Sequence, residues 1–376
     1  MPVALAVAAA LAGLPAPADA PPAAAGPAAA YVQLEPVPGG AVSFRVRGVE
    51  ATRWHPGGAG GRPFFYPLTA PTAAPGAGSL VRMGHPGAPN HDHHRGVWFA
   101  HRDVDGRNFW ENDPNVAVRQ TEWLALESGL GEGRMACRIA WVDADGRTVL
   151  TQELVTALRP LGSALNEGGY ELELTVAFRP GEDGPGEDGP DVGGPITLGE
   201  TNFGLLGVRV AESVSAHFGA GQLTDDAGRT GEAAIFGNPA RWVDYSGPVP
   251  VGRGDGFRFE PHGVTVFDHP ANRPAADGDE SDEPAGEPTR WHVRADGWIG
   301  PSLCRTGPRE VSAEEPLRLR YLLHVHPGPY AAEAAAVRYE AFLARPAPAV
   351  RKSSRPHTAY EIVPALPTPA DRAAGD

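Results

Sequence analysis

Hydrophobic and polar residues alternate along much of the chain after residue 30, and this period of two predicts β-strands. The first pair is a hairpin over residues 31–49, with Gly39-Gly40 at its turn. Within residues 170–178 the leucines and the valine face one side of the expected strand, and the glutamates face the other. Further strands are expected at residues 64–68, 121–126, 134–142, 148–158, 263–268 and 317–325.

Helical periodicity is clear in one segment only, residues 331–345, which Pro346 ends. Many short strands, frequent turns and one C-terminal helix predict an all-β fold, a large antiparallel β-sandwich. Galactose mutarotases and other sugar-active proteins share this kind of architecture, an analogy at the level of the fold alone. The sequence has no βαβ alternation and no P-loop, which argues against a nucleotide-binding α/β fold.

Composition separates the chain into a leader, one domain and a tail. Residues 1–30 are rich in Ala and Pro, residues 31–346 carry the strand pattern, and residues 347–376 are expected to be an irregular tail. Inside the domain, residues 180–195 and 274–288 are acidic and rich in Gly or Pro, so both are expected to be loops.

The leader resembles a secretory signal peptide. Residues 3–14 form an apolar run too short to span a bilayer, and Ala18-Asp19-Ala20 fits the small-x-small pattern of a cleavage site. The expected location is therefore periplasmic or secreted. No Lys or Arg precedes the apolar run, so a disordered leader on a cytoplasmic protein stays the alternative. No other segment is expected to cross a membrane.

Charge and cysteine content exclude several classes of function. The net charge is −14, with 32 Lys and Arg against 46 Asp and Glu, which argues against a nucleic-acid-binding protein. The two cysteines, Cys137 and Cys304, lack the spacing of a zinc site and are expected to be core residues.

The histidines concentrate near residue 95. Of thirteen in the chain, five lie between His85 and His101. On an extended strand His91 and His93 would share a face, with His94 opposite, and two imidazoles form half of a site for one divalent or redox metal ion. His101 would lie about 26 Å from His93 on one straight strand, too far to share a metal. More distant residues are therefore the better partners, namely Asn202, His269 and His292.

The same stretch also suits acid–base chemistry without a metal. A neutral imidazole titrates near working pH, which makes His93, His94 and His292 candidate catalytic groups. Arg95 could hold an oxyanion or a sugar hydroxyl. Trp98 and Trp110 could stack on a sugar ring, although core packing is the alternative for both.

Other polar residues at expected strand ends complete the candidate substrate-binding set. His292 and Arg294 share a strand face, and Asp244 shares one with Trp242. A solvated sheet face is the alternative for the first pair, and a plain turn for Asp244. The set consists of Trp98, Trp110, Asn202, Asp244, His269, Asn272 and Arg294.

Six stretches together resemble a bacterial family labelled "methane oxygenase PmoA" or PmoA-like, over about residues 40–345. They are residues 82–86, 91–98, 108–110, 240–247, 267–272 and 291–294. The resemblance implies a soluble β-rich protein of carbohydrate metabolism more than an alkane oxygenase, whose subunits span membranes. One His-Pro-Thr link of the family pattern is missing here, since acidic residues 275–287 follow Asn272.

These observations predict a soluble, exported carbohydrate-processing enzyme that uses a histidine-rich pocket for acid–base chemistry on a small-molecule or carbohydrate substrate. Two alternatives stay open. One is an iron- or copper-dependent oxidoreductase, as the family label implies. The other is a sugar-binding module without catalysis.

Overall fold

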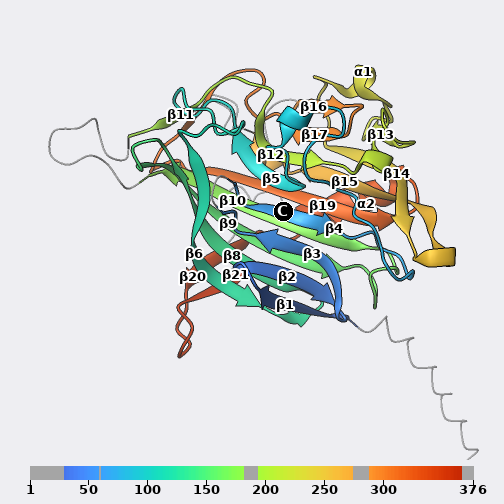
Figure 1. The fold of residues 1–376 in the computed structure, drawn as a ribbon. Helices are drawn as coiled ribbons and strands as arrows, with labels where there is room; N and C mark the ends of the chain where they lie inside the picture. Colours follow the sequence, from blue (N-terminus) through green and yellow to red (C-terminus); the bar gives the residue numbers. More distant parts are fainter. Residues whose placement is uncertain (1–28, 59–60, 182–193, 274–287, 366–376) are drawn as a thin grey trace, which may run out of the picture.

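Two large antiparallel sheets pack face to face in the computed structural model, which describes residues 29–58, 61–181, 194–273 and 288–365 (Figure 1). This confirms the predicted all-β sandwich. The nine-stranded sheet has the order β16 (Trp291–Arg294), β17 (Trp298–Pro301), β12 (Gly204–Arg209), β5 (Val97–His101), β4 (Phe64–Leu68), β3 (Val49–His55), β2 (Ala41–Val46), β1 (Tyr31–Val37) and β7 (Gly129–Leu130).

The second sheet has eight strands, and two small two-stranded sheets accompany the sandwich. Its order is β13 (Gln222–Asp225), β14 (Trp242–Val251), β15 (Arg258–Asp268), β19 (Leu317–Pro327), β10 (Tyr170–Pro180), β9 (Thr148–Pro160), β8 (Gly133–Val142) and β6 (Ala117–Glu127). The small pairs are β11 (Ile196–Leu198) with β18 (Arg309–Val311), and β20 (Pro348–Lys352) with β21 (Tyr360–Pro364).

Helices are few among the described residues. The predicted C-terminal helix is present as α2 (Ala332–Leu343), and α1 (Glu232–Ile235) has a single turn. The described segments also contain four short 3-10 helices: η1 (Pro89–His91), η2 (Glu212–Val214), η3 (Gly254–Gly256) and η4 (Pro270–Asn272).

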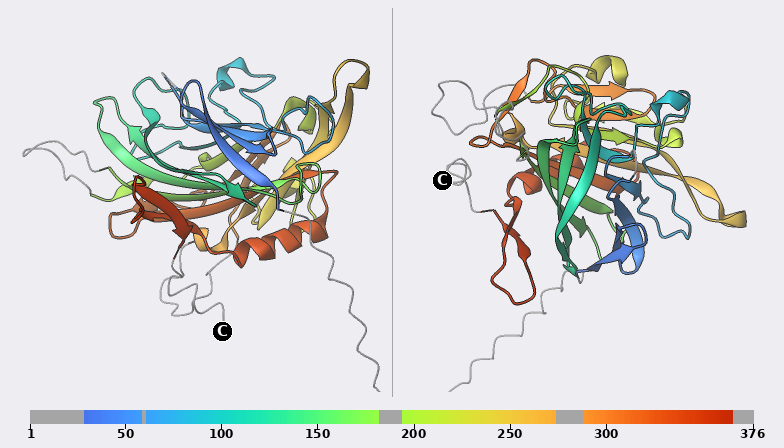
Figure 2. Two further views of the ribbon diagram at one scale, coloured as in Figure 1. Left: turned by 90° about the horizontal axis from the view of Figure 1, so that it is seen from below. Right: turned by 60° about the vertical axis from the view of Figure 1, so that its left-hand side comes forward.

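Alternating side chains divide each strand between the shared core and an outer face. On β10, Leu172 and Leu174 enter the core between the sheets, as predicted. Glu171 and Glu173 point the other way, yet both are buried. Helix α2 lies across this outer face (Figure 2, left). Its Tyr339 packs on Trp242 and Phe267, and its Arg338 pairs with Glu171 of β10. The polar face of β10 is therefore covered by the helix.

The predicted irregular tail is wrong for residues 348–364, which form the β20–β21 hairpin. Its Ile362 is buried against Leu124 and Val155 on the outer face of the second sheet. The Ile362 amide also donates a hydrogen bond to Glu127. The hairpin forms because the sheet offers an apolar surface to cover, which the tail sequence alone does not show.

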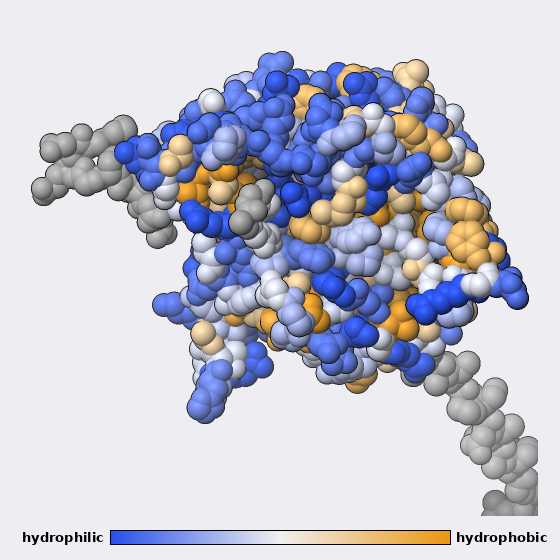
Figure 3. All heavy atoms as spheres, in the orientation of Figure 1, coloured by the Kyte–Doolittle hydropathy of each residue, from blue (hydrophilic) through white to orange (hydrophobic). Residues whose placement is uncertain are grey.

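Both cysteines are free and buried, as predicted. In the described parts of the chain, no helix has the length and apolar character needed to cross a membrane. The face drawn in Figure 3 is mostly hydrophilic, with hydrophobic residues in separate patches. Residues 1–28 of the leader and most of both acidic loops lie outside the described residues.

Candidate functional site

Strand β5 places two kinds of side chain on opposite faces of the nine-stranded sheet. Val97 and Phe99 enter the core between the sheets, whereas Trp98 and Ala100 face outward. Outward-facing Trp98 joins Trp110 and Trp298 in a separate aromatic cluster, and all three are buried. The tryptophan ring centroids lie 5.1 to 5.9 Å apart.

The loop that carries the histidines is closed at its base by the backbone. Gly84 donates a hydrogen bond to His94, and Gly96 donates one to Arg82, so the two ends of the loop pair like strands. Between these ends the chain makes η1 and a turn. The expected extended strand over residues 91–94 is therefore wrong.

This turn brings His94 to the same side as the two histidines that it was expected to oppose. The ring centroid of His91 lies 5.4 Å from that of His93 and 5.3 Å from that of His94. His93 and His94 are 4.5 Å apart, and His85 is 5.4 Å from His91. A strand would have separated them, whereas the turn gathers four imidazoles.

The histidines meet the tryptophans at His94. Its ring lies 5.5 Å from Trp98 and 5.6 Å from Trp298. We call this group the histidine–tryptophan site; its members are His91, His93, His94, Trp98, Trp110 and Trp298. Trp298 was not predicted, because its place in the site depends on the pairing of β12 with β17.

Three buried polar atoms of this site have no hydrogen-bond partner among the described residues. They are Nδ1 of His94, Nε1 of Trp98 and Nε1 of Trp298. A buried polar atom without a partner costs about 1–3 kcal/mol, so most such atoms in folded proteins are paired. Three of them in one cluster of touching rings make this cluster a candidate binding site for a ligand that could pair them.

Burial keeps the inner imidazoles neutral. Burial, and then the charge of Arg62, lowers the pKa of His93 to about 4. Burial and the neighbouring His93 lower the pKa of His94 to about 2. Burial and the charge of Arg294 lower the pKa of His292 to about 4. Near pH 7 all three are therefore neutral, and each can accept a hydrogen bond at the ring nitrogen that carries no proton.

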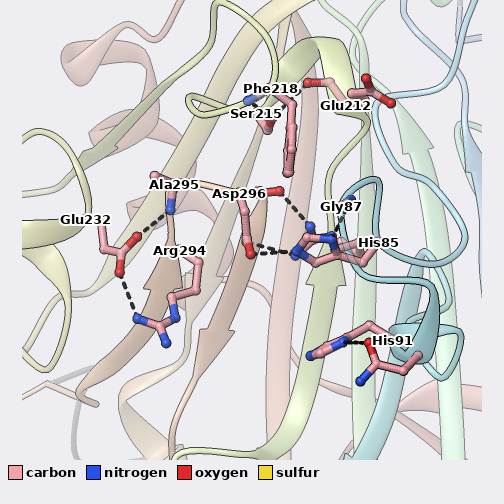
Figure 4. A network of polar contacts seen from close by, with 12 residues as sticks. His85, Gly87, His91, Glu212, Ser215, Phe218, Glu232, Arg294, Ala295 and Asp296 are labelled. Carbon is pink, nitrogen blue, oxygen red and sulfur yellow. Dashed lines mark hydrogen bonds and ion pairs between the residues drawn. The ribbon is translucent and has the colours of Figure 1, made fainter.

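His85 is fixed by a polar network that reaches Asp296 in the turn between β16 and β17 (Figure 4). Its Nε2 lies 2.8 Å from Asp296, and its Nδ1 accepts a hydrogen bond from the Gly87 amide. Buried Arg209 donates to the same carboxylate at 2.9 Å. Because both ring nitrogens are engaged, His85 positions the loop. Its partner Asp296 lies 211 positions away, and no sequence pattern connects the two.

A family model described as "Family of unknown function (DUF6807)" matches residues 41–340, which include the whole site. The chain belongs to the DUF6807 family. No curated protein matches it.

Two further predicted residues border the site of this DUF6807 domain. The His292 ring lies 5.8 Å from that of Trp298, and its Nδ1 donates to the Asn202 carbonyl at 3.3 Å. The side-chain oxygen of Asn202 accepts from Arg305. Arg294 is more exposed, and its guanidinium pairs with Glu232 (Figure 4).

The structure places three predicted residues elsewhere, on the second sheet. Asp244 is buried and accepts hydrogen bonds from Ser246 and Thr265, with His326 at 2.9 Å. His269 lies beside α2, where its ring packs 5.3 Å from Phe342. Asn272 also lies at that end, bonded to Asp268 and to the Arg320 carbonyl. Asp244 lies within β14, and His269 and Asn272 follow β15; both strands belong to the other sheet, so these residues do not join His91–His94.

The four imidazoles do not form a ready metal site. Among the described residues, no three His, Cys, Asp or Glu side chains converge in an arrangement that could hold a metal ion. Nearby carboxylates are already bonded, Asp92 to Asn112 and Asp296 to Arg209. Metal binding by His91 and His93 stays a prediction without a third ligand.

The loop depends on Gly96, which leads to a first testable prediction. Gly96 has φ +61°, and a Cβ there would lie 2.3 Å from the Phe65 carbonyl oxygen. We expect Gly96→Ala to lower the free energy of unfolding by about 3 kcal/mol, from both the left-handed backbone and the overlap. Urea denaturation measures this change.

Gly84 provides the matched control. It has φ +69° in the same loop, and a Cβ there meets nothing within 4 Å. Gly84→Ala should therefore cost only the backbone term, about 1 kcal/mol. Equal losses in the two variants would show that the contact with Phe65 does not constrain the loop.

Proposed function

We propose that this DUF6807 domain is a carbohydrate-processing enzyme and that the histidine–tryptophan site binds its substrate. The observation that carries the proposal is the set of three buried, unpartnered polar atoms of His94, Trp98 and Trp298. A sugar presents hydroxyl groups that match such donors and acceptors. It also presents an apolar ring face that packs on indole rings, since aromatic residues with a polar handle suit half-polar ligands.

The imidazoles supply the acid–base chemistry of the proposal. His93 is neutral near pH 7 because burial lowers its pKa to about 4, so it is available as a general base. His94 sits deeper and orients the ligand through Nδ1. Arg95 follows in the chain, with its guanidinium 5.9 Å from the Phe64 ring, and would stabilise negative charge on the substrate.

The test combines a binding variant with a catalytic variant, measured on a panel of monosaccharides. Trp298→Phe keeps an aromatic ring and removes the free Nε1 donor, so affinity should fall about 3–10-fold. His93→Gln should keep binding and reduce kcat about 10²–10⁴-fold. Calorimetric titration gives the affinity, and a product assay on each bound sugar gives the rate.

Trp123→Phe is the control, because Trp123 lies on β6 in the other sheet and is partly exposed. Trp123→Phe should change neither the affinity for sugars nor kcat. If His93→Ala and His94→Ala leave turnover of every accepted sugar unchanged, the catalytic proposal fails. Binding that responds to Trp298→Phe without any turnover would select the alternative of a sugar-binding module.

The second candidate is the metal-dependent oxidoreductase that the PmoA-like label implies. The four gathered imidazoles favour it, while the lack of a converging third ligand counts against it. Elemental mass spectrometry on untagged protein tests it, since about one equivalent of iron or copper would make oxygen chemistry the better hypothesis. Export is a separate proposal from the leader sequence, and the mass of the mature protein tests it.

A further inference from the structure

A cavity of about 310 Å³ lies next to the histidine–tryptophan site. Phe64 connects the two, because it lines the cavity and also packs against the aromatic cluster around Trp98. The volume is in the range of pockets that hold small organic ligands. The cavity is therefore a continuation of the site into which one end of a substrate could extend.

The described lining of this cavity is basic and contains no carboxylate. Its ionisable residues are Arg53, His55, Arg62 and Arg95. Arg53 is paired with Glu50 outside the lining. The chain as a whole is acidic, with a net charge of −14. The positive charge of three arginines around one cavity is therefore a local feature, opposite in sign to the charge of the whole chain.

Arg62 is a buried cation without an acidic partner in the described chain. Its Nη1 donates to the Trp110 carbonyl at 2.6 Å and its Nη2 to the Glu111 carbonyl at 3.0 Å. Burial, and then the charge of Arg95, lowers the pKa of Arg62 to about 9, so the guanidinium remains protonated near pH 7. A buried charge is costly unless an opposite charge compensates it, which favours binding of an anion nearby.

Arg95 contributes the accessible charge. It forms no ion pair with a described carboxylate, and its buried Nε has no hydrogen-bond partner there. Its guanidinium lies on the Phe64 ring at 5.9 Å and against Gly61, where an added Cβ would be 3.5 Å from Cζ. Phe64 and Gly61 thus hold a planar, multi-donor cation at the border between cavity and aromatic cluster.

We propose that this cavity binds the anionic group of the substrate, a carboxylate or a phosphate, through Arg95 and the charge of Arg62. Guanidinium groups bind both kinds of oxyanion through paired hydrogen bonds. Resting on the proposed function, this makes the substrate an acidic sugar, whose ring lies on the tryptophans while its anionic end enters the cavity.

The experiment compares galactose, galacturonate and galactose 6-phosphate, with acetate and inorganic phosphate as probes of the anion alone. Calorimetric titrations at constant ionic strength give each affinity. Arg95→Gln keeps part of the side-chain length and removes the charge; Arg95 is partly exposed, so the variant should fold. It should weaken binding of the preferred acidic sugar about 10–100-fold and that of galactose less than about 3-fold.

Arg102→Gln is the matched control. Arg102 also stacks on an aromatic ring of the cluster, with its guanidinium 5.5 Å from Phe203, but it does not line the cavity. It should leave all affinities unchanged. A loss equal to that of Arg95→Gln would mean that general positive charge attracts the ligand, and the cavity would no longer be its binding site.

The remaining outcomes separate this inference from the proposed function. Tighter binding of galacturonate or of the phosphate ester, lost in Arg95→Gln, supports both and identifies the anionic group. Equal binding of all three sugars, unaffected by Arg95→Gln, overturns the anion site alone. Binding of acetate or phosphate without any sugar supports the anion site and contradicts the carbohydrate function. No binding of any probe overturns both.

Discussion

Between pH 6.5 and 4.5 the free energy of unfolding is expected to fall by about 5 kcal/mol or more, which is a large share of a typical domain's stability. The cause is a set of histidines that the fold buries as neutral groups. Burial is the largest cause in each case, and it lowers their pKa values to about 4 for His93, His101 and His292, about 3 for His324 and about 2 for His94.

The sign follows from which state binds more protons. Below pH 6.5 these histidines take up protons in the unfolded chain but stay neutral in the folded one, so stability is present above pH 6.5 and is lost on acidification. Asp268 opposes the loss, because burial raises its pKa to about 6 and the folded state binds its proton first. His326 opposes it as well, because its hydrogen bond to Asp244 outweighs burial and raises its pKa. These two groups cannot offset five imidazoles, so the net effect is destabilisation by acid.

Urea denaturation over this pH range measures the effect, and His324→Gln tests its cause. The variant should reduce the pH slope by up to about 1.4 kcal/mol per pH unit, the value for one proton. Val325→Ala is the control on the same strand, because it removes buried apolar contacts without removing a titratable group. The dependence of its free energy of unfolding on pH should therefore be the same as in the unmodified protein. An unchanged slope in His324→Gln would contradict the assignment to buried histidines.

Glu173→Gln is expected to cost about 3–5 kcal/mol, since it would leave the buried guanidinium of Arg320 without a counter-charge, whereas Arg159 and Arg345 would keep Glu132 and Glu171. Glu173 is fully buried under α2 and accepts hydrogen bonds from Arg320 at 2.7 Å and from Arg159 at 2.6 Å, with Arg345 at 3.2 Å. Burial alone would raise the pKa of Glu173, but Arg320 and Arg159 outweigh it and hold that pKa below its usual value.

Glu122→Gln on β6 is the matched control. Glu122 pairs with Arg138 on the same sheet, but both side chains are exposed, and such pairs contribute about 0–1 kcal/mol. Urea denaturation at pH 7 measures both variants. A loss below about 1 kcal/mol for Glu173→Gln would show that the buried arginines find other partners or water when the carboxylate is neutralised.

Local pattern was enough to predict most strands, because a strand with one face in the core must alternate apolar and polar residues. The hairpin over residues 31–49 and the strand at residues 64–68 appear where the alternation placed them. Pattern could not show that the polar side of residues 170–178 is buried. That depends on α2, which begins more than 150 positions later.

The sequence by itself determined the all-β class, the single long helix and the concentration of histidines near residue 95. Only the tertiary structure decided which side chains share a site. It joined Trp298 and His292 to His94 through sheet pairing, and it separated Asp244, His269 and Asn272 onto the other sheet. The physical reason is that strand alternation is a local property of neighbouring residues, whereas strand order and turn geometry arise from contacts between distant segments.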